Sequence, residues 1–160
     1  MRQFAELKYS ACRTGGANGS DHAFFLGARK LELFLPWEGF NGHTTGVHTY
    51  TKEQLKFADS ILKRAYPYPV KRYETMMFFR RNVFQILGLC ANEREIKKSK
   101  FVLCWTPDGA TTMADYNREV TGGTGIAINV ASLFDVPVYN LQRRDHRREI
   151  KEFINQSRAA

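Results

Sequence analysis

The stretch Arg13-Thr14-Gly15-Gly16-Ala17-Asn18-Gly19-Ser20-Asp21 decides how this chain is expected to fold. A strand-like run, Tyr9-Ser10-Ala11-Cys12, precedes it, and an apolar helix-like run, Ala23-Phe24-Phe25-Leu26, follows it. A glycine-rich turn between a strand and a helix leaves backbone N–H groups free where the helix dipole favours an anionic oxygen. Gly15 and Gly16 permit positive φ, and Asp21 or Ser20 is a candidate cap for the helix. A plain tight turn explains one such loop equally well.

A second loop of the same type is therefore important. Thr121-Gly122-Gly123-Thr124-Gly125 opens the helix-like run 126–134, and the apolar strand Phe101-Val102-Leu103-Cys104 lies upstream of it. Strands alternate with helices along the chain, which predicts an α/β fold with a Rossmann-like parallel sheet flanked by helices. Loops at the carboxyl ends of parallel strands line one edge of a sheet, so we expect the two glycine loops to face one cleft.

Three other elements can be predicted from local signals. Thr51-Lys52-Glu53-Gln54 matches a capping box and predicts a helix start, while a second helix is expected over residues 71–89. The loop 37–50 is either a lid or pocket wall, or a loop that packs its own aromatic side chains on the core. Arg80 falls on the apolar stripe of helix 71–89, beside Arg81-Asn82. A guanidinium there needs a partner, either a structural carboxylate or a ligand phosphate.

The composition is that of one globular domain. The chain has 160 residues, of which 43% are hydrophobic, which is enough for a single core spanning residues 1–160. No apolar run approaches the roughly 18 residues that a membrane span needs, and residues 1–8 lack the apolar region of a secretory signal. We therefore expect a cytoplasmic protein with no membrane partner. Residues 4–7 are expected to form a short helical turn.

The net charge of +8 is concentrated on two segments. Residues 71–100 carry eight Lys and Arg against three Glu, and residues 142–160, a predicted charged C-terminal helix, carry six against three acids. Such an excess attracts polyanions or phosphate-bearing ligands, but solvated helix faces explain most of it. Three cysteines with no Cys-x-x-Cys spacing indicate buried reduced thiols, and two loop histidines, His43 and His48, have no third ligand nearby. We expect neither a metal nor a cofactor.

The motifs taken together resemble those of a known family. They are the two glycine loops, Leu35-Pro36-Trp37, Phe40-Asn41-Gly42, Arg81-Asn82, Cys104-Trp105-Thr106-Pro107-Asp108-Gly109 and Pro137-Val138-Tyr139-Asn140-Leu141. This combination resembles small phage-type, stand-alone proteins of the SLOG superfamily, which includes the DNA-processing protein DprA and the LOG phosphoribohydrolases. The resemblance implies a Rossmann-like domain that binds nucleotide-derived ligands and forms homo-oligomers. SLOG domains in antiviral defence sense cyclic ADP-ribose-like signals.

The resemblance also bears on catalysis. LOG enzymes carry a Glu four residues after the last glycine of the second loop, and this chain has Asn129 there, with Thr121 in place of the motif's proline. An amide cannot act as a general base or stabilise an oxocarbenium charge as a carboxylate does. A nucleoside monophosphate N-glycosidase would therefore need a substitute carboxylate, for which the candidates are Asp21, Asp108, Asp115 and Glu119. Arg81 resembles the family's arginine upstream of the second loop.

Three functions follow as hypotheses. The preferred one is a non-enzymatic module that binds a cyclic ADP-ribose-like or other phosphorylated nucleoside signal, and that withdraws it from a host sensor if the chain is phage-encoded. The alternatives are the N-glycosidase and a DprA-like single-stranded DNA binder that uses residues 71–100. Trp37, Trp105 or Tyr50 would stack on a base. The predicted ligand-binding set is Arg13, Gly15, Gly16, Asn18, Asp21, Trp37, Arg81, Trp105, Thr106, Gly122, Gly123, Thr124, Gly125 and Asn140.

Overall fold

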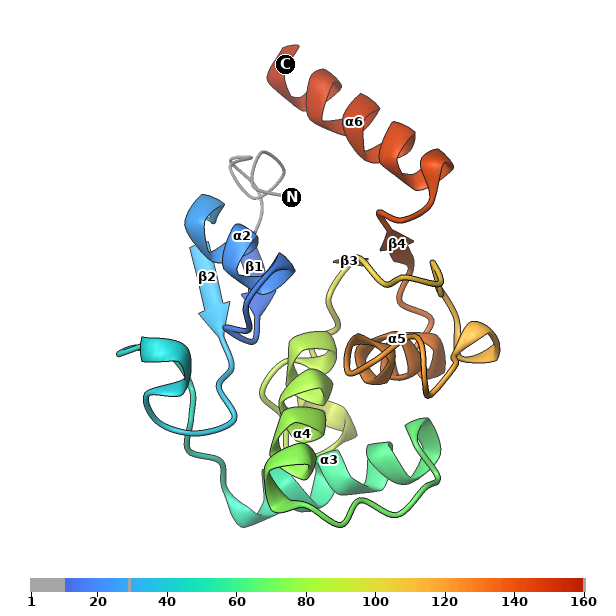
Figure 1. Cartoon of the computed structure of the whole chain (residues 1–160). Coiled ribbons are helices and arrows are strands. Elements are labelled where there is room, and N and C mark those ends of the chain that lie inside the picture. The colour runs from blue at the N-terminus through green and yellow to red at the C-terminus, as the bar shows by residue number, and fades with distance from the viewer. Residues whose placement is uncertain (1–10, 29, 160) are drawn as a thin grey trace.

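The computed structural model describes residues 11–28 and 30–159, and in them helices and parallel strands alternate as predicted (Figure 1). The strands are β1 (Ala11–Thr14), β2 (Lys30–Leu33), β3 (Val102–Cys104) and β4 (Val138–Asn140). The helices are α2 (Ser20–Gly27), α3 (Lys52–Ala65), α4 (Tyr73–Leu87), α5 (Thr124–Leu133) and α6 (Arg144–Ala159). Short 3-10 turns cover Phe40–Gly42, Glu93–Glu95 and Met113–Asp115. The turn expected over residues 4–7 lies outside the described residues.

The strands form two short parallel sheets instead of one continuous sheet. β1 pairs with β2, Ala11 opposite Lys30, and β3 pairs with β4, Val102 opposite Val138. Within the described residues no ladder joins the two pairs. A side chain connects them instead, because the guanidinium of Arg13 on β1 donates to the carbonyl of Lys97, in the segment that leads to β3. The fold is therefore mixed α/β, and the full sheet expected from the sequence is replaced by two halves.

Two groups of helices cover opposite sides of these strands. Along β3, Val102 packs into the large core cluster under α3, α4 and α5, whereas the next residue, Leu103, packs into a smaller cluster with Ile150 and Ile154 of α6. This alternation is the period-2 pattern of a strand that is covered on both faces. In Figure 1, α3, α4 and α5 accordingly gather below the strands, and α6 lies above them.

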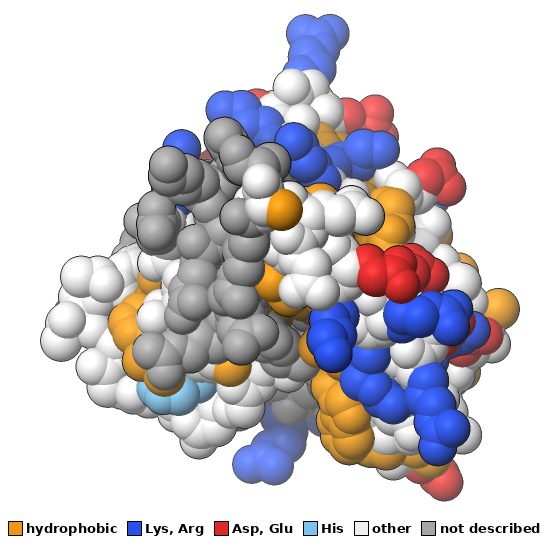
Figure 2. Space-filling view, turned by 90° about the horizontal axis from the view of Figure 1, so that it is seen from above, with side chains coloured by type: hydrophobic (Ala, Val, Ile, Leu, Met, Phe, Trp, Pro, Cys, Tyr) orange, Lys and Arg blue, Asp and Glu red, His pale blue; other side chains and the backbone are white. Residues whose placement is uncertain are grey.

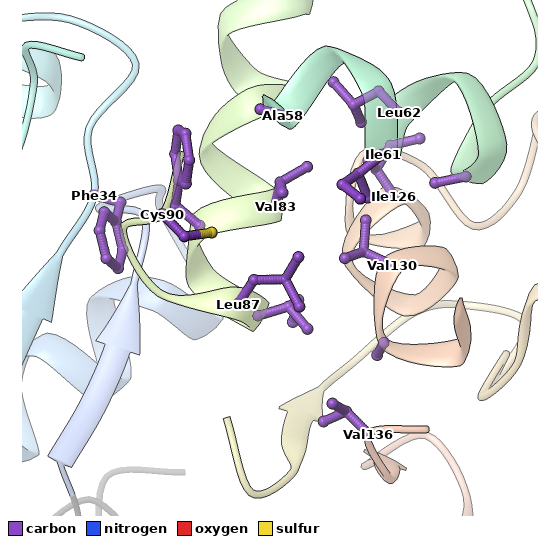
Figure 3. Close-up of a cluster of buried hydrophobic side chains, with 14 residues drawn as sticks. Phe34, Ala58, Ile61, Leu62, Val83, Leu87, Cys90, Ile126, Val130 and Val136 are labelled. Carbon is purple, nitrogen blue, oxygen red and sulfur yellow. The ribbon is translucent and has the colours of Figure 1, made fainter. Parts of the chain in front are cut away.

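Helix α4 is the centre of the larger core. Its residues Val83, Phe84 and Leu87 are fully buried in the larger cluster, to which residues of α3 and α5 also contribute (Figure 3). The capping box at Thr51 is confirmed: the Gln54 N–H donates to the Thr51 hydroxyl, and the Gln54 side chain accepts from the Thr51 N–H. At the other end, Gly88 closes α4 with a φ of 77°, a value that favours glycine.

Several predicted boundaries move by a few residues. The first strand continues to Thr14, so Arg13 lies in β1 and not in the loop, because Arg13 pairs with Glu32 of β2; the predicted strand residues 9 and 10 lie outside the described residues. Strand β2 ends at Leu33, after which Phe34 and Leu35 bridge to Val47 of the following loop. Within the residues described, no helix is at once long and apolar enough to cross a bilayer.

The charged C-terminal helix is confirmed as α6. Ile150 and Ile154 are buried against Phe24 of α2, while Phe153 is 48% exposed. Residues 150 and 154 are one helical turn apart and share a face, whereas residue 153 lies at the margin of that face. Figure 2 looks onto this side of the molecule and shows Lys and Arg side chains spread over it, with acidic side chains among them.

Candidate functional site

Two neighbouring side chains of α4 connect the two glycine loops. The Nη1 of Arg81 donates to the carbonyl of Gly15 at 2.7 Å, and the Nδ2 of Asn82 donates to the carbonyl of Gly123 at 3.0 Å. Loops that are far apart in the sequence therefore flank one short stretch of one helix.

The first loop is filled by the protein's own carboxylate. Both Gly15 and Ala17 donate their backbone N–H to Oδ2 of Asp21 at 3.2 Å. Helix α2 has Gly19 as its N-cap residue and no side-chain cap, so Asp21 faces back into the loop instead of capping the helix as expected. A carboxylate in the first turn of a helix is favoured by the helix dipole. These N–H groups, which were expected to meet a ligand, are therefore already occupied by an anion.

Neighbouring side chains occupy the space that a Cβ would need at Gly15 and at Gly16. A Cβ on Gly15 would lie 2.5 Å from Cζ of Arg81, so the guanidinium packs directly on the glycine backbone. Gly16 has a φ of +69°, and a Cβ there would lie 2.8 Å from the His43 ring. The loop 37–50 thus covers the first glycine loop, and Asn41 Nδ2 donates to the Gly16 carbonyl at 2.9 Å.

Arg81 is a buried cation, and no carboxylate of residues 11–28 or 30–159 forms an ion pair with it. It is 7% exposed, and its Nε has no hydrogen-bond partner. The rings of Phe40 and Phe78 lie 5.9 and 5.3 Å from its Cζ and interact with the positive charge. Burial lowers the pKa of Arg81, and the charge of Asp21 opposes this shift. A buried guanidinium with an unused donor is typical of a site that receives an anion from outside.

Arg80 has the opposite environment. Its Nε and Nη2 donate to the two carboxylate oxygens of Asp59 on α3, at 2.7 and 2.8 Å. The hydrogen bond to Asp59 raises the pKa of Arg80. Of the two alternatives for this residue, the structural carboxylate is therefore the one observed.

The second loop is open, in contrast to the first. Gly122 (φ 70°) and Gly123 (φ −64°, ψ −27°) are exposed, and no atom lies within 4 Å of a Cβ built on either residue. Successive left- and right-handed residues turn their N–H groups towards one concave side, which is an anion-binding arrangement. The N–H groups of Gly125 and Ile126 are used within the turn. Those of Gly123 and Thr124, at the start of α5, have no acceptor within a helix.

Two groups hold the second loop in place. Asn117 donates its N–H to the Thr121 hydroxyl at 2.9 Å, and that hydroxyl donates to the Asp108 carboxylate. The ring of Tyr116 lies where a Cβ of Gly125 would be, at 2.3 Å from Cε2, so Gly125 serves packing and not a ligand.

A hollow of about 340 Å³ lies beside the first loop. It is lined by Gly16 and Asn18 of the first loop, by His22 and Phe25 of α2, and by residues 41–45. Both interpretations of the loop 37–50 are thus realised, because residues 41–45 are a pocket wall and Trp37 and Phe40 pack on Phe78 of α4.

Three predicted ligand-binding residues are engaged in structural hydrogen bonds. Arg13 pairs with Glu32 at 2.6 Å and with the Lys97 carbonyl. Asn140 is fully buried, and its amide makes four bonds, to the Thr106 N–H and hydroxyl, the Ala110 carbonyl and the Gln142 N–H. Thr106 is 1% exposed. Thr106 and Asn140 shape the loop after β3, Arg13 ties β1 to β2 and to Lys97, and all three have little capacity left for a ligand.

The three candidate stacking residues differ in exposure. Trp37 is 38% exposed and Trp105 51%, so both present ring surface to solvent. Tyr50 instead stacks on Phe84 in the core, with ring centroids 5.0 Å apart, and its hydroxyl donates to the Leu35 carbonyl. Burial raises the pKa of Tyr50.

The carboxylates considered for catalysis also serve the fold. Burial tends to raise the pKa of Asp108, but hydrogen bonds from Thr121, Thr106 and the Ala110 N–H outweigh it and lower that pKa. Thr111 and Thr112 donate to Asp115 and lower its pKa as well. Asn129 is directed into the core, where its Nδ2 donates to the Ala65 carbonyl at 2.8 Å.

Some basic side chains of the segment 71–100 make hydrogen bonds within the protein. Besides Arg80 and Arg81, Lys98 is engaged, since its Nζ donates to the Phe134 carbonyl at 2.9 Å. Within residues 11–28 and 30–159, no three His, Cys, Asp or Glu side chains are grouped so as to hold a metal ion.

Sequence reasoning did not identify Phe78, Asn41 or His43 as parts of the site. Phe78 lies three residues before Arg81 on one helix, a spacing that places the two side chains on one face. The two loop residues carry no such signal, because nothing local places residues 41–45 over Gly16. Comparison of the chain with protein-family models, with curated proteins and with solved structures finds no match.

The thiols provide a first prediction. Burial raises the pKa of Cys12 and of Cys90 to about 11 and that of Cys104 to about 12, from 9.0. Since the thiolate is the reactive form, its fraction at pH 8 falls roughly 100-fold at a pKa of about 11. We expect a disulfide reagent at pH 8 to modify all three cysteines quickly in urea and at least 50-fold more slowly in the folded protein. If any of the three thiols reacted as fast in the folded protein as in urea, the burial of that thiol would be contradicted.

Proposed function

We propose that the chain binds a phosphate-bearing, nucleotide-derived ligand between its two glycine loops, without cleaving it. The observation that carries this proposal is the pair Arg81–Asn82, which holds Gly15 and Gly123 on adjacent residues of α4. The N–H groups of Gly123 and Thr124 at the start of α5, next to the open glycines of the second loop, and the positive charge of the buried Arg81 are complementary to a phosphate. Trp37, which contacts Phe78 one turn before Arg81, offers a partly exposed ring for a base.

We further propose that the chain is a stand-alone SLOG-type domain and that β1–β2 and β3–β4 are the halves of a Rossmann-like sheet. Both pairs are parallel, and residues from both pairs pack into the cluster under α6. In this proposal the ligand is a cyclic ADP-ribose-like signal or another phosphorylated nucleoside. A phage-encoded chain would act in the host cytoplasm, as a homo-oligomer that sequesters the signal as an anti-defence protein.

The test is calorimetric titration with a panel of cyclic ADP-ribose isomers, cyclic oligonucleotides and adenine nucleotides. At a concentration 100 times Kd, a true ligand stabilises the protein by about 2.7 kcal/mol. That corresponds to a rise in Tm of roughly 5–10 °C for a chain of this size. Chromatography of the heat-released ligand should recover it intact. A panel with neither heat nor stabilisation would refute the proposal, and a released base would show the alternative N-glycosidase activity.

A glycine pair in this chain gives a matched mutational test. Gly122 and Gly39 have almost the same φ, 70° and 71°, and both have open space where a Cβ would lie. Gly122→Ala and Gly39→Ala should therefore each cost roughly 1–2 kcal/mol of stability through the left-handed backbone alone. We expect only Gly122→Ala to weaken binding as well, by at least about 10-fold, because it turns the N–H groups of the second loop away from the phosphate. Equal affinities for the two variants would remove this loop from the site.

A further inference from the structure

We propose that the hollow beside the first loop is the subsite for the uncharged nucleoside part of the ligand, and that Asp21 is the residue that keeps phosphate out of it. The inference rests on the proposed function and assigns the two ends of the ligand to different places. Its starting observation is the contrast between a first loop that holds a built-in anion and a second loop that is open.

The lining of the hollow matches a nucleoside in size and polarity. Its volume of about 340 Å³ lies at the lower end of the range of small-ligand pockets. Among the described residues that line it, none is Lys, Arg, Asp or Glu. Asn18, Asn41 and Thr44 offer amide and hydroxyl groups suited to base edges and ribose. The rings of Phe25 and His43, 4.9 Å apart and edge to face, supply an apolar surface.

Asp21 determines which group the first loop can accept. Its Oδ2 takes the N–H groups of Gly15 and Ala17, on both sides of the lining residue Gly16. A phosphate at those N–H groups would be repelled by the carboxylate, since like charges at close range disfavour each other. A carboxylate has about four acceptor sites, so Asp21, which adjoins the lining residue Gly16 but does not itself line the hollow, keeps acceptor capacity for a hydroxyl group that reaches the first loop. The first loop therefore selects for a hydroxyl-bearing group.

The phosphate then has a defined position relative to the nucleoside. From Gly16, which lines the hollow, a path of contacts within the protein runs through Gly15 and Arg81 to Asn82 and the carbonyl of Gly123. The positive charge on this path belongs to Arg81, whose Nε is buried and unpaired. In this proposal the nucleoside lies in the hollow and the phosphate lies towards the second loop, where the positive charge of Arg81 favours it.

The experiment uses adenosine and inorganic pyrophosphate as separate probes of the full chain, with the tightest nucleotide of the panel as reference. We expect the two probes to bind together without competition, measured by titrating one in the presence of the other. Thr44→Trp, which fills the hollow from an exposed position, should abolish adenosine binding and weaken the nucleotide at least 10-fold. Pyrophosphate should be unaffected by it. Thr49→Trp, an exposed position of the same loop outside the hollow, is the matched control.

Asp21→Asn tests the specificity residue. Removing the charge while keeping the shape should raise the affinity for pyrophosphate about 10-fold and lower that for adenosine. If pyrophosphate affinity is unchanged in the folded variant, or if the two probes compete in the unchanged protein, the division of the site is wrong. If the nucleotide binds Thr44→Trp as it binds Thr49→Trp, the hollow subsite is refuted while the proposed function stands. If no nucleotide binds the unchanged protein, the hollow subsite and the proposed function are both refuted.

Discussion

Arg81→Met is expected to weaken nucleotide binding about 30-fold while leaving the folded chain nearly as stable as before. A hydrogen bond from a charged group is worth about 2 kcal/mol, which corresponds to that loss of affinity. The folded chain loses the bond to the Gly15 carbonyl, but it no longer buries a guanidinium that lacks a carboxylate in contact. Methionine also packs well against the rings of Phe40 and Phe78. We therefore expect a change in unfolding free energy within about 1 kcal/mol.

The neighbouring arginine is the control for this prediction. Arg80→Met removes the two-point contact with Asp59 and should cost roughly 1 kcal/mol of stability with no change in affinity. Calorimetry measures the ligand affinity of each variant, and urea denaturation measures its free energy of unfolding. If Arg81→Met instead loses stability and keeps its affinity, Arg81 is a structural tie between α4 and the first loop and does not bind the ligand.

Phe84→Ala is expected to have the largest effect on stability. Phe84 has no exposed surface and packs against Tyr50 and Phe34, with ring centroids 5.0 and 6.3 Å away. Removing a buried phenyl ring costs about 3–5 kcal/mol, since the cavity adds to the lost transfer energy. That is a large share of the 5–15 kcal/mol that usually stabilises a domain. In urea, the unfolding midpoint should fall by roughly 2 M.

Tyr73→Ala on the same helix is the comparison for Phe84→Ala. Tyr73 is 68% exposed, so its truncation should change the unfolding free energy by less than about 0.5 kcal/mol. A Phe84→Ala variant that unfolds as late as Tyr73→Ala would mean that α4 does not form the centre of the core.

Much of the site could be predicted because its signals are local. Two glycine-rich runs, each before a helix, predict open turns, and Thr121-Gly122-Gly123-Thr124-Gly125 has that form in the structure. The capping box at Thr51 depends on residues three apart and is confirmed. The proposed roles of Gly122, Gly123 and Arg81 in ligand binding stay predictions.

Other residues could not be assigned from the sequence because their partners are distant. The apolar stripe of helix 71–89 indicated that Arg80 needs a partner, and Asp59 of α3 is that partner. The sequence did not indicate that the Nε of the neighbouring Arg81 is buried without a hydrogen-bond partner. Arg13 lies in a glycine-rich motif but pairs with a residue of the neighbouring strand. Helical and strand periods identify which face a side chain occupies, and they do not identify the group opposite to it.

The sequence by itself therefore determined the alternation of strands and helices, the two glycine turns and the capping box at Thr51, since each depends on residues within a few positions of one another. The tertiary structure alone decided that Asp21 fills the first turn while the second stays open, that Arg81 and Asn82 join the two turns, and that residues 41–45 wall the hollow. These features depend on how elements pack, because burial and hydrogen bonding between distant segments select the contacts that local patterns leave undetermined.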